Sequence, residues 1–67
     1  MESYIVDVTL YTGKHYQSND FPKLRDAIDF ANTLVLRTMV DLVDVIDTKT
    51  GEIKHSTNKT LAAQRLA

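Results

Sequence analysis

The sequence predicts a small, soluble α+β domain in which one amphipathic helix packs on one face of a small antiparallel sheet. Three observations support this fold class. Apolar and polar residues alternate near the start of the chain, and apolar residues recur at helical spacing in the middle. The third observation is a segment rich in β-branched residues, which is followed by a turn that contains glycine. The predicted order is strand–strand–helix–strand–strand (β-β-α-β-β), followed by a short C-terminal helical tail.

The first strand is predicted over residues 4–11, where side chains alternate at period two. One face carries Tyr4, Val6, Val8 and Leu10, and the other carries Ile5, Asp7, Thr9 and Tyr11. Such a pattern is typical of a half-buried strand rich in β-branched and aromatic residues. Gly13 can adopt the positive φ that a tight turn needs, so residues 14–17 are expected to return as a second, short strand.

The helix is expected to begin near the capping residues 18–20, with Pro22 in its first turn, and to run to about Thr38. Its apolar stripe consists of residues at three- and four-residue intervals: Leu24, Ala27, Ile28, Ala31, Leu34 and Val35. Arg25 and Asp29 are four residues apart on the polar side and can form an ion pair.

Residues 39–47 form the most apolar segment, and their β-branched content favours a strand. One face carries Val40, Leu42 and Ile46 together with Asp44, and the other carries Val43 and Val45 together with Asp41 and Asp47. Both faces therefore carry apolar side chains. This strand is therefore central in the sheet or covered on its second face, and a bulge near Val43-Asp44 also explains the pattern. A hairpin loop containing Gly51 follows, and residues 52–56 return as a polar edge strand.

The 67 residues are expected to form one domain, with a core over about 4–56 and a tail over 57–67 that is either helical or frayed. The chain has 43% hydrophobic and 25% charged residues, which is typical of a globular protein.

The chain contains no cysteine, so disulfides and thiolate metal sites are excluded. With no apolar span or secretory signal recognised, a cytoplasmic location without membrane contact is expected.

Charge is divided unevenly along the chain, although the net charge is only −1. Residues 1–47 hold eight acids and four bases, giving −4, whereas residues 48–67 hold one acid and four bases, giving +3. Such a distribution can steer a charged partner or a second copy, or it can simply reflect solvated surfaces.

No catalytic constellation is recognised, so the chain is predicted not to be an enzyme and to use no cofactor. His15 and His55 lack the spacing of a zinc motif. Asp41, Asp44 and Asp47 recur at every third residue, which on a strand turns the middle carboxylate away from the other two. Solvated carboxylates at a hairpin boundary are the preferred interpretation, and no metal site is predicted.

The uncovered sheet face is the predicted interaction surface, since a single helix covers only one side of the sheet. It is expected to carry Ile5, Thr9, Tyr11, Val43 and Val45. A protein partner is predicted to bind there or on the acidic strand, with partner-binding residues Ile5, Tyr11, Asp41, Val43 and Val45.

A homodimer that buries the same face is the first alternative to a separate protein partner. Nucleic-acid binding is the second, because exposed aromatic rings can stack on bases and lysines can contact phosphate. The residues considered for that role are Tyr4, Tyr11, Tyr16, Lys14, Lys49, Lys54 and Lys59.

Several segments together resemble small accessory proteins encoded by bacteriophages, which place one helix against a small sheet. The resemblance covers about residues 4–56 and is carried by the pattern Thr12-Gly13-Lys14, residues 21–31, residues 43–47 and Thr50-Gly51-Glu52-Ile53. It implies a modulator of a host protein such as RNA polymerase or a defence nuclease, acting in the host cytoplasm. No functional residue is carried over, because the resemblance contains no diagnostic motif.

Overall fold

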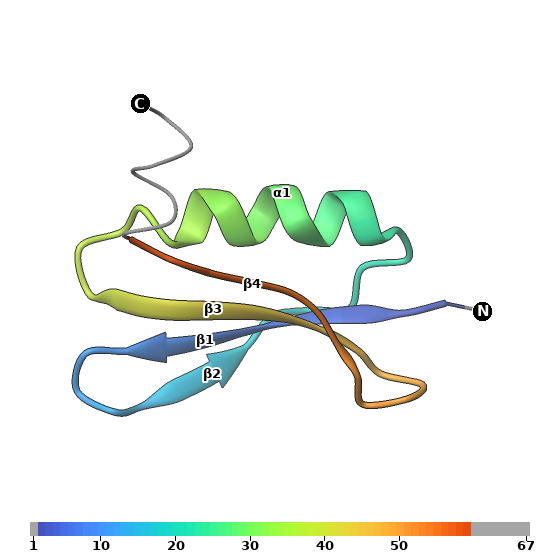
Figure 1. The fold of residues 1–67 in the computed structure, drawn as a ribbon, viewed down its shortest axis with the longest axis horizontal. Coiled ribbons are helices and arrows are strands. Elements are labelled where there is room, and N and C mark those ends of the chain that lie inside the picture. Colours follow the sequence, from blue (N-terminus) through green and yellow to red (C-terminus); the bar gives the residue numbers. More distant parts are fainter. Residues whose placement is uncertain (1, 60–67) are drawn as a thin grey trace.

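The computed structural model describes residues 2–59, and these fold as one four-stranded antiparallel sheet with one helix on one side (Figure 1). The elements in chain order are β1 (Tyr4–Leu10), β2 (His15–Gln17), α1 (Leu24–Leu34), β3 (Val40–Asp47) and β4 (Ile53–Asn58). Within the sheet the strands lie in the order β2-β1-β3-β4. The predicted α+β class, with its small antiparallel sheet and one helix, is confirmed.

Two tight hairpins connect the sequential strand pairs, and each uses a glycine with positive φ. Gly13, at φ 91°, lies between β1 and β2, where its N–H donates to the Leu10 carbonyl at 2.9 Å. Gly51, at φ 76°, closes the turn between β3 and β4, and its N–H donates to the Asp47 carbonyl at 2.7 Å. Both predicted turn positions are confirmed, since other residues rarely adopt this backbone conformation.

Strand β3 is central, because it pairs with β1 on one side and with β4 on the other. This position explains why apolar residues occur on both of its faces. The predicted bulge near Val43-Asp44 is not where the register shifts: the irregularities fall between Thr9 and Leu10 against β3, and between Val45 and Ile46 against β4. The first shift leaves Asp41 as an extra residue, so Val40 joins the same buried face as Val43.

The helix is shorter than expected at its N-terminus, and Ser18, one of the proposed capping residues, has another role. Lys23 occupies the N-cap position without a side-chain hydrogen bond. Ser18 instead pairs with β1: its N–H donates to the Val6 carbonyl at 2.9 Å, and its Oγ accepts from the Val6 N–H at 3.0 Å. Phe21 then forms a two-bond bridge with Tyr4. This segment satisfies the outer edge of β1 before the chain can turn into the helix.

The C-terminal end of the helix lies at Leu34 rather than near Thr38. Residues 35–39 leave the helical path in order to enter the central strand, and the Tyr11 N–H donates to the Met39 carbonyl at 3.1 Å. Val35, just past the helix, is fully buried. Within the described residues, the predicted Arg25–Asp29 ion pair is not formed.

The core lies between α1 and the facing side of the sheet and is built from small or β-branched side chains. Its buried members are Tyr4, Val6, Val8, Ala27, Ala31, Leu34, Val35, Val40, Val43 and Val45. Two alanines on the inner side of α1 leave room for close contact between helix and sheet. Ile28, expected in the apolar stripe, is only half-buried and packs at the margin of the core.

Two of the predictions about the strands are wrong. Val43 and Val45 were expected on the uncovered face, yet they are 0% exposed, because the register places them opposite Val8 and Val6 beneath the helix. Thr57, assigned to the tail, belongs to β4 together with Asn58. The remainder of the predicted helical tail, residues 60–67, lies outside the described residues.

Candidate protein-interaction surface

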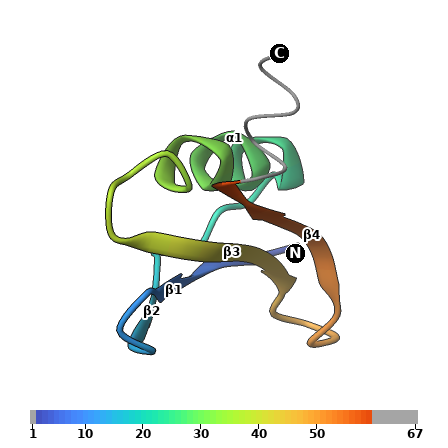
Figure 2. The same cartoon turned by 60° about the vertical axis from the view of Figure 1, so that its left-hand side comes forward.

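The side of the sheet opposite α1 is not covered by any described helix or strand, as the two views in Figures 1 and 2 show. Residues paired directly across antiparallel strands share a face, and so do alternate residues along one strand where no bulge intervenes. The register shift between Val45 and Ile46 lies in the β3–β4 pairing, so Ile53 is on the same face as Ile46 although His55 is on the face of Val45. We call the side of the sheet that faces away from α1 the open face. It consists of Ile5, Asp7, Thr9, His15, Gln17, Leu42, Asp44, Ile46, Ile53, Ser56 and Asn58.

The open face is organised as three rows that run across the strands. An isoleucine row at one end joins Ile5, Ile46 and Ile53 on three neighbouring strands. Ile53 is 58% exposed, whereas Ile5 and Ile46 are half-buried by their neighbours. Three aliphatic side chains are thus held side by side at the surface of a rigid sheet, an arrangement that a partner's apolar group can cover.

A carboxylate row lies next to the isoleucine row, because Asp7 and Asp44 are directly opposite each other on β1 and β3. Asp44 Oδ1 accepts a hydrogen bond from Ser56 Oγ at 2.6 Å. Within residues 2–59 the Asp7 carboxylate has neither a hydrogen bond nor an ion pair. Two like charges opposite each other disfavour the fold, so this row is not explained by stability.

A shallow polar hollow adjoins the carboxylate row where β2 meets β1. Its volume is about 390 Å³, and it is lined by Asp7, His15, Tyr16 and Gln17. The wall provides a carboxylate, an amide and an imidazole, and no Lys or Arg lies among the lining residues.

The third row of the open face lies on the other side of the carboxylate row from the isoleucines. It joins Thr9 and Leu42, with His15 and Asn58 at its ends.

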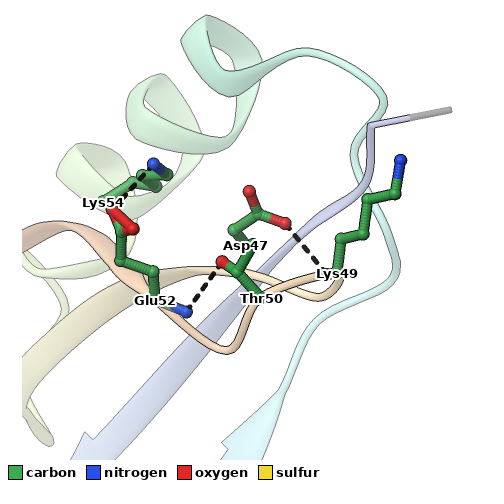
Figure 3. A network of polar contacts seen from close by, with 5 residues as sticks. All are labelled: Asp47, Lys49, Thr50, Glu52 and Lys54. Atoms are coloured by element: carbon green, nitrogen blue, oxygen red, sulfur yellow. Dashed lines mark hydrogen bonds and ion pairs between the residues drawn. The ribbon is translucent and has the colours of Figure 1, made fainter.

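The β3–β4 loop is held by its own polar side chains (Figure 3). Asp47 Oδ1 accepts from the Lys49 N–H at 2.9 Å, and Thr50 Oγ1 accepts from the Glu52 N–H at 3.2 Å. Lys54 forms an ion pair with Glu52 at 2.8 Å. Hydrogen bonding and the nearby carboxylate of Glu52 raise the pKa of Lys54. These groups stabilise the hairpin, so Asp47 and Lys54 already have partners within the chain.

Lys59 connects three separate parts of the fold. Its Nζ donates to the carbonyl oxygens of Val35, at 3.2 Å, and Arg37, and it lies 6.0 Å from the centre of the Tyr11 ring. A cation at this position complements the negative end of α1. Lys59 and Lys54, both considered for phosphate contacts, are therefore engaged within the protein. Tyr4, considered for base stacking, is buried.

The two histidines lie apart and on different sides of the sheet. His15 is exposed on the open face, whereas the half-buried His55 lies toward the helix, with Nε2 3.3 Å from Asn32 Oδ1. Among residues 2–59, no three His, Cys, Asp or Glu side chains form a group suited to holding a metal ion.

Of the predicted partner-binding residues, Ile5 lies on the open face. Tyr11 is 58% exposed beside Lys59, and Asp41 is exposed at the bulge. Val43 and Val45 cannot contact a partner because they are buried in the core. Sequence reasoning separated the two faces of β3 but assigned them to the wrong sides, and so missed Leu42, Asp44 and Ile46. The pairing of β3 with β1 was the missing information.

Comparison with protein-family models, curated proteins and solved structures finds no match for this chain. Among residues 2–59, no helix has the length and apolar character required to cross a membrane.

Proposed function

We propose that this chain is a non-enzymatic protein-interaction module that binds its partner through the open face. The observation that carries the proposal is the isoleucine row, since aliphatic side chains on three adjacent strands are left on the side of the sheet that α1 does not cover. Removing such an apolar surface from water lowers the free energy, so its burial by a partner favours binding. The polar row of Asp7, Asp44 and Ser56 borders it, and a mixture of apolar and polar groups is typical of interfaces that also exist unbound.

The proposed mode of action is occlusion: the module occupies a surface of its target and thereby blocks other contacts there. This mode agrees with the resemblance to phage-encoded modulators of host enzymes, and it requires only a stable scaffold with one specific face. The two hairpins and the central β1–β3 pairing hold that face in a fixed geometry. A preformed surface reduces the entropy lost on binding.

Site-directed photo-crosslinking in living cells tests this proposal. A photoreactive phenylalanine analogue replaces Ile46 on the open face, and the matched control carries it at the exposed Arg25 on α1. We expect a discrete adduct with one other protein from position 46 only, and we expect Ile5→Asp to abolish it. Adducts of equal pattern from both positions, or none from position 46, contradict the proposal.

The same experiment separates a foreign partner from a second copy. An adduct that contains two copies of this chain, and no other protein, replaces the proposed module by a homodimer. Nucleic-acid binding is not proposed, because the open face carries two aspartates and the candidate lysines Lys54 and Lys59 are bound within the fold.

A further inference from the structure

The charge of the open face restricts the chemistry of its partner. The carboxylates of Asp7 and Asp44 lie opposite each other in the middle of that face, and within residues 2–59 neither forms an ion pair. Their residues belong to neighbouring strands, so the Cα atoms are about 5 Å apart. The hollow next to Asp7 adds the side chains of Gln17 and His15 but no lysine or arginine.

The geometry points to a partner segment that presents an arginine to the carboxylate row and an aliphatic side chain to the isoleucine row. This inference rests on the proposed function, which it deepens by defining the partner. A guanidinium is planar, carries five N–H donors and can donate to two carboxylates at once. It therefore fits a pair of facing aspartates better than a single ammonium does.

The spacing of the two rows determines where the aliphatic group must lie. Ile5 and Asp7, like Ile46 and Asp44, are two residues apart on the same strand, which corresponds to about 7 Å. An extended partner segment repeats this spacing when its arginine and its aliphatic residue are separated by one residue. Such a segment places both side chains on the same side, toward the open face.

A second copy of this chain is a poorer occupant of the same face. When two open faces meet in register, the carboxylate rows of both copies come together without a cation between them. Like charges brought together in this way cost free energy and discriminate against the wrong partner. Charge complementarity therefore favours a cationic partner over self-association.

Nuclear magnetic resonance titration of the full, ¹⁵N-labelled chain tests the inference. The probe is a capped synthetic peptide, Ser-Ile-Ser-Arg-Ser-Ile-Ser, and its control has citrulline, a neutral group of nearly the same shape, in place of arginine. We expect shift changes confined to the open face and an affinity about tenfold higher for the arginine peptide. This advantage should decrease as salt is added.

Two double variants complete the test. Asp7→Asn with Asp44→Asn should remove the advantage of the arginine peptide, whereas Asp26→Asn with Asp29→Asn on the helix should retain it. Equal affinity for both peptides on the open face overturns the arginine inference and leaves the protein-interaction proposal intact. Shift changes that map to α1, or none with either peptide, also overturn the inference. Failure of the crosslink at position 46 instead contradicts the proposed function itself.

Discussion

At the level of single residues, the buried hydroxyl of Thr57, like that of Ser3, has no hydrogen-bond partner within residues 2–59. Thr57 is 1% exposed on the inner side of β4, opposite Val43. A buried polar group without a partner costs about 1–3 kcal/mol. Its position is explained by shape, because threonine has nearly the same volume and branching as valine.

Thr57→Val is therefore expected to raise the free energy of unfolding by about 1 kcal/mol, since it removes the unpaired hydroxyl and keeps the β-branched shape. Urea denaturation followed by circular dichroism measures the change. Thr9→Val, at a half-buried position on the open face, is the matched control and should have a smaller effect. A destabilised Thr57→Val variant contradicts the assignment of an unpaired hydroxyl.

The facing aspartates predict a second stabilising substitution. Asp7→Asn removes the repulsion with Asp44 and should raise the free energy of unfolding by roughly 0.2–1 kcal/mol at low salt. The gain should decrease at high salt, where exposed charges are screened. Asp29→Asn on the outer side of α1 provides the control. If Asp7→Asn destabilises the fold at low salt, the two carboxylates do not repel as described.

At the level of secondary-structure elements, the fold depends on contacts made where elements end. Ser18 and Phe21 continue the pairing of β1 beyond β2, and Lys59 follows directly after β4 and reaches the C-terminal end of α1. The positions where neighbouring elements begin explain two differences from the expected boundaries of α1. The helix begins later because the preceding residues bond to β1, and it ends earlier because the chain must enter the central strand.

Lys59→Met tests the contribution of this connection between elements. The substitution keeps a long aliphatic side chain but removes the hydrogen bonds to the carbonyls of Val35 and Arg37, and we expect a loss of about 1–2 kcal/mol in unfolding free energy. Lys49→Met, at an exposed position in the β3–β4 loop, is the matched control. Equal stability of both variants contradicts a stabilising role for the Lys59 ammonium.

At the level of the whole molecule, the raised pKa values of Tyr4 and Lys54, at one end of the sheet, make the stability of the fold decrease at alkaline pH. Burial, followed by the carboxylates of Glu2 and Asp47, raises the pKa of Tyr4 above 10.0, and Glu52 raises the pKa of Lys54 above 10.5. A group whose pKa is raised by folding stabilises the fold at lower pH. That contribution is lost as the pH rises through the pKa of the folded state. Both groups therefore act in the same direction.

Thermal unfolding over an alkaline pH series tests this coupling. The melting temperature should fall as the pH rises past the ordinary tyrosine value of 10.0, and Tyr4→Phe should make that fall less steep. Tyr11→Phe, which removes an exposed hydroxyl, is the matched control. A fall that is reduced equally by both variants contradicts the assignment to Tyr4.

The sequence by itself determined the fold class, the two glycine turns and most of the core. These features depend on local patterns: period-two alternation in residues 4–10, helical spacing from Leu24 to Leu34, and the requirement for positive φ at Gly13 and Gly51. The bulk of each element is predictable from such patterns, because they reflect the geometry of one segment alone.

Only the tertiary structure decided which side of β3 is buried. A shift of one residue in strand pairing exchanges the two faces, and the sequence of β3 carries apolar side chains on both. The bulge at Asp41 and the register with β1 place Val43 and Val45 under the helix and leave Leu42, Asp44 and Ile46 on the open face. The candidate interaction surface therefore depends on contacts between distant segments, which no local pattern specifies.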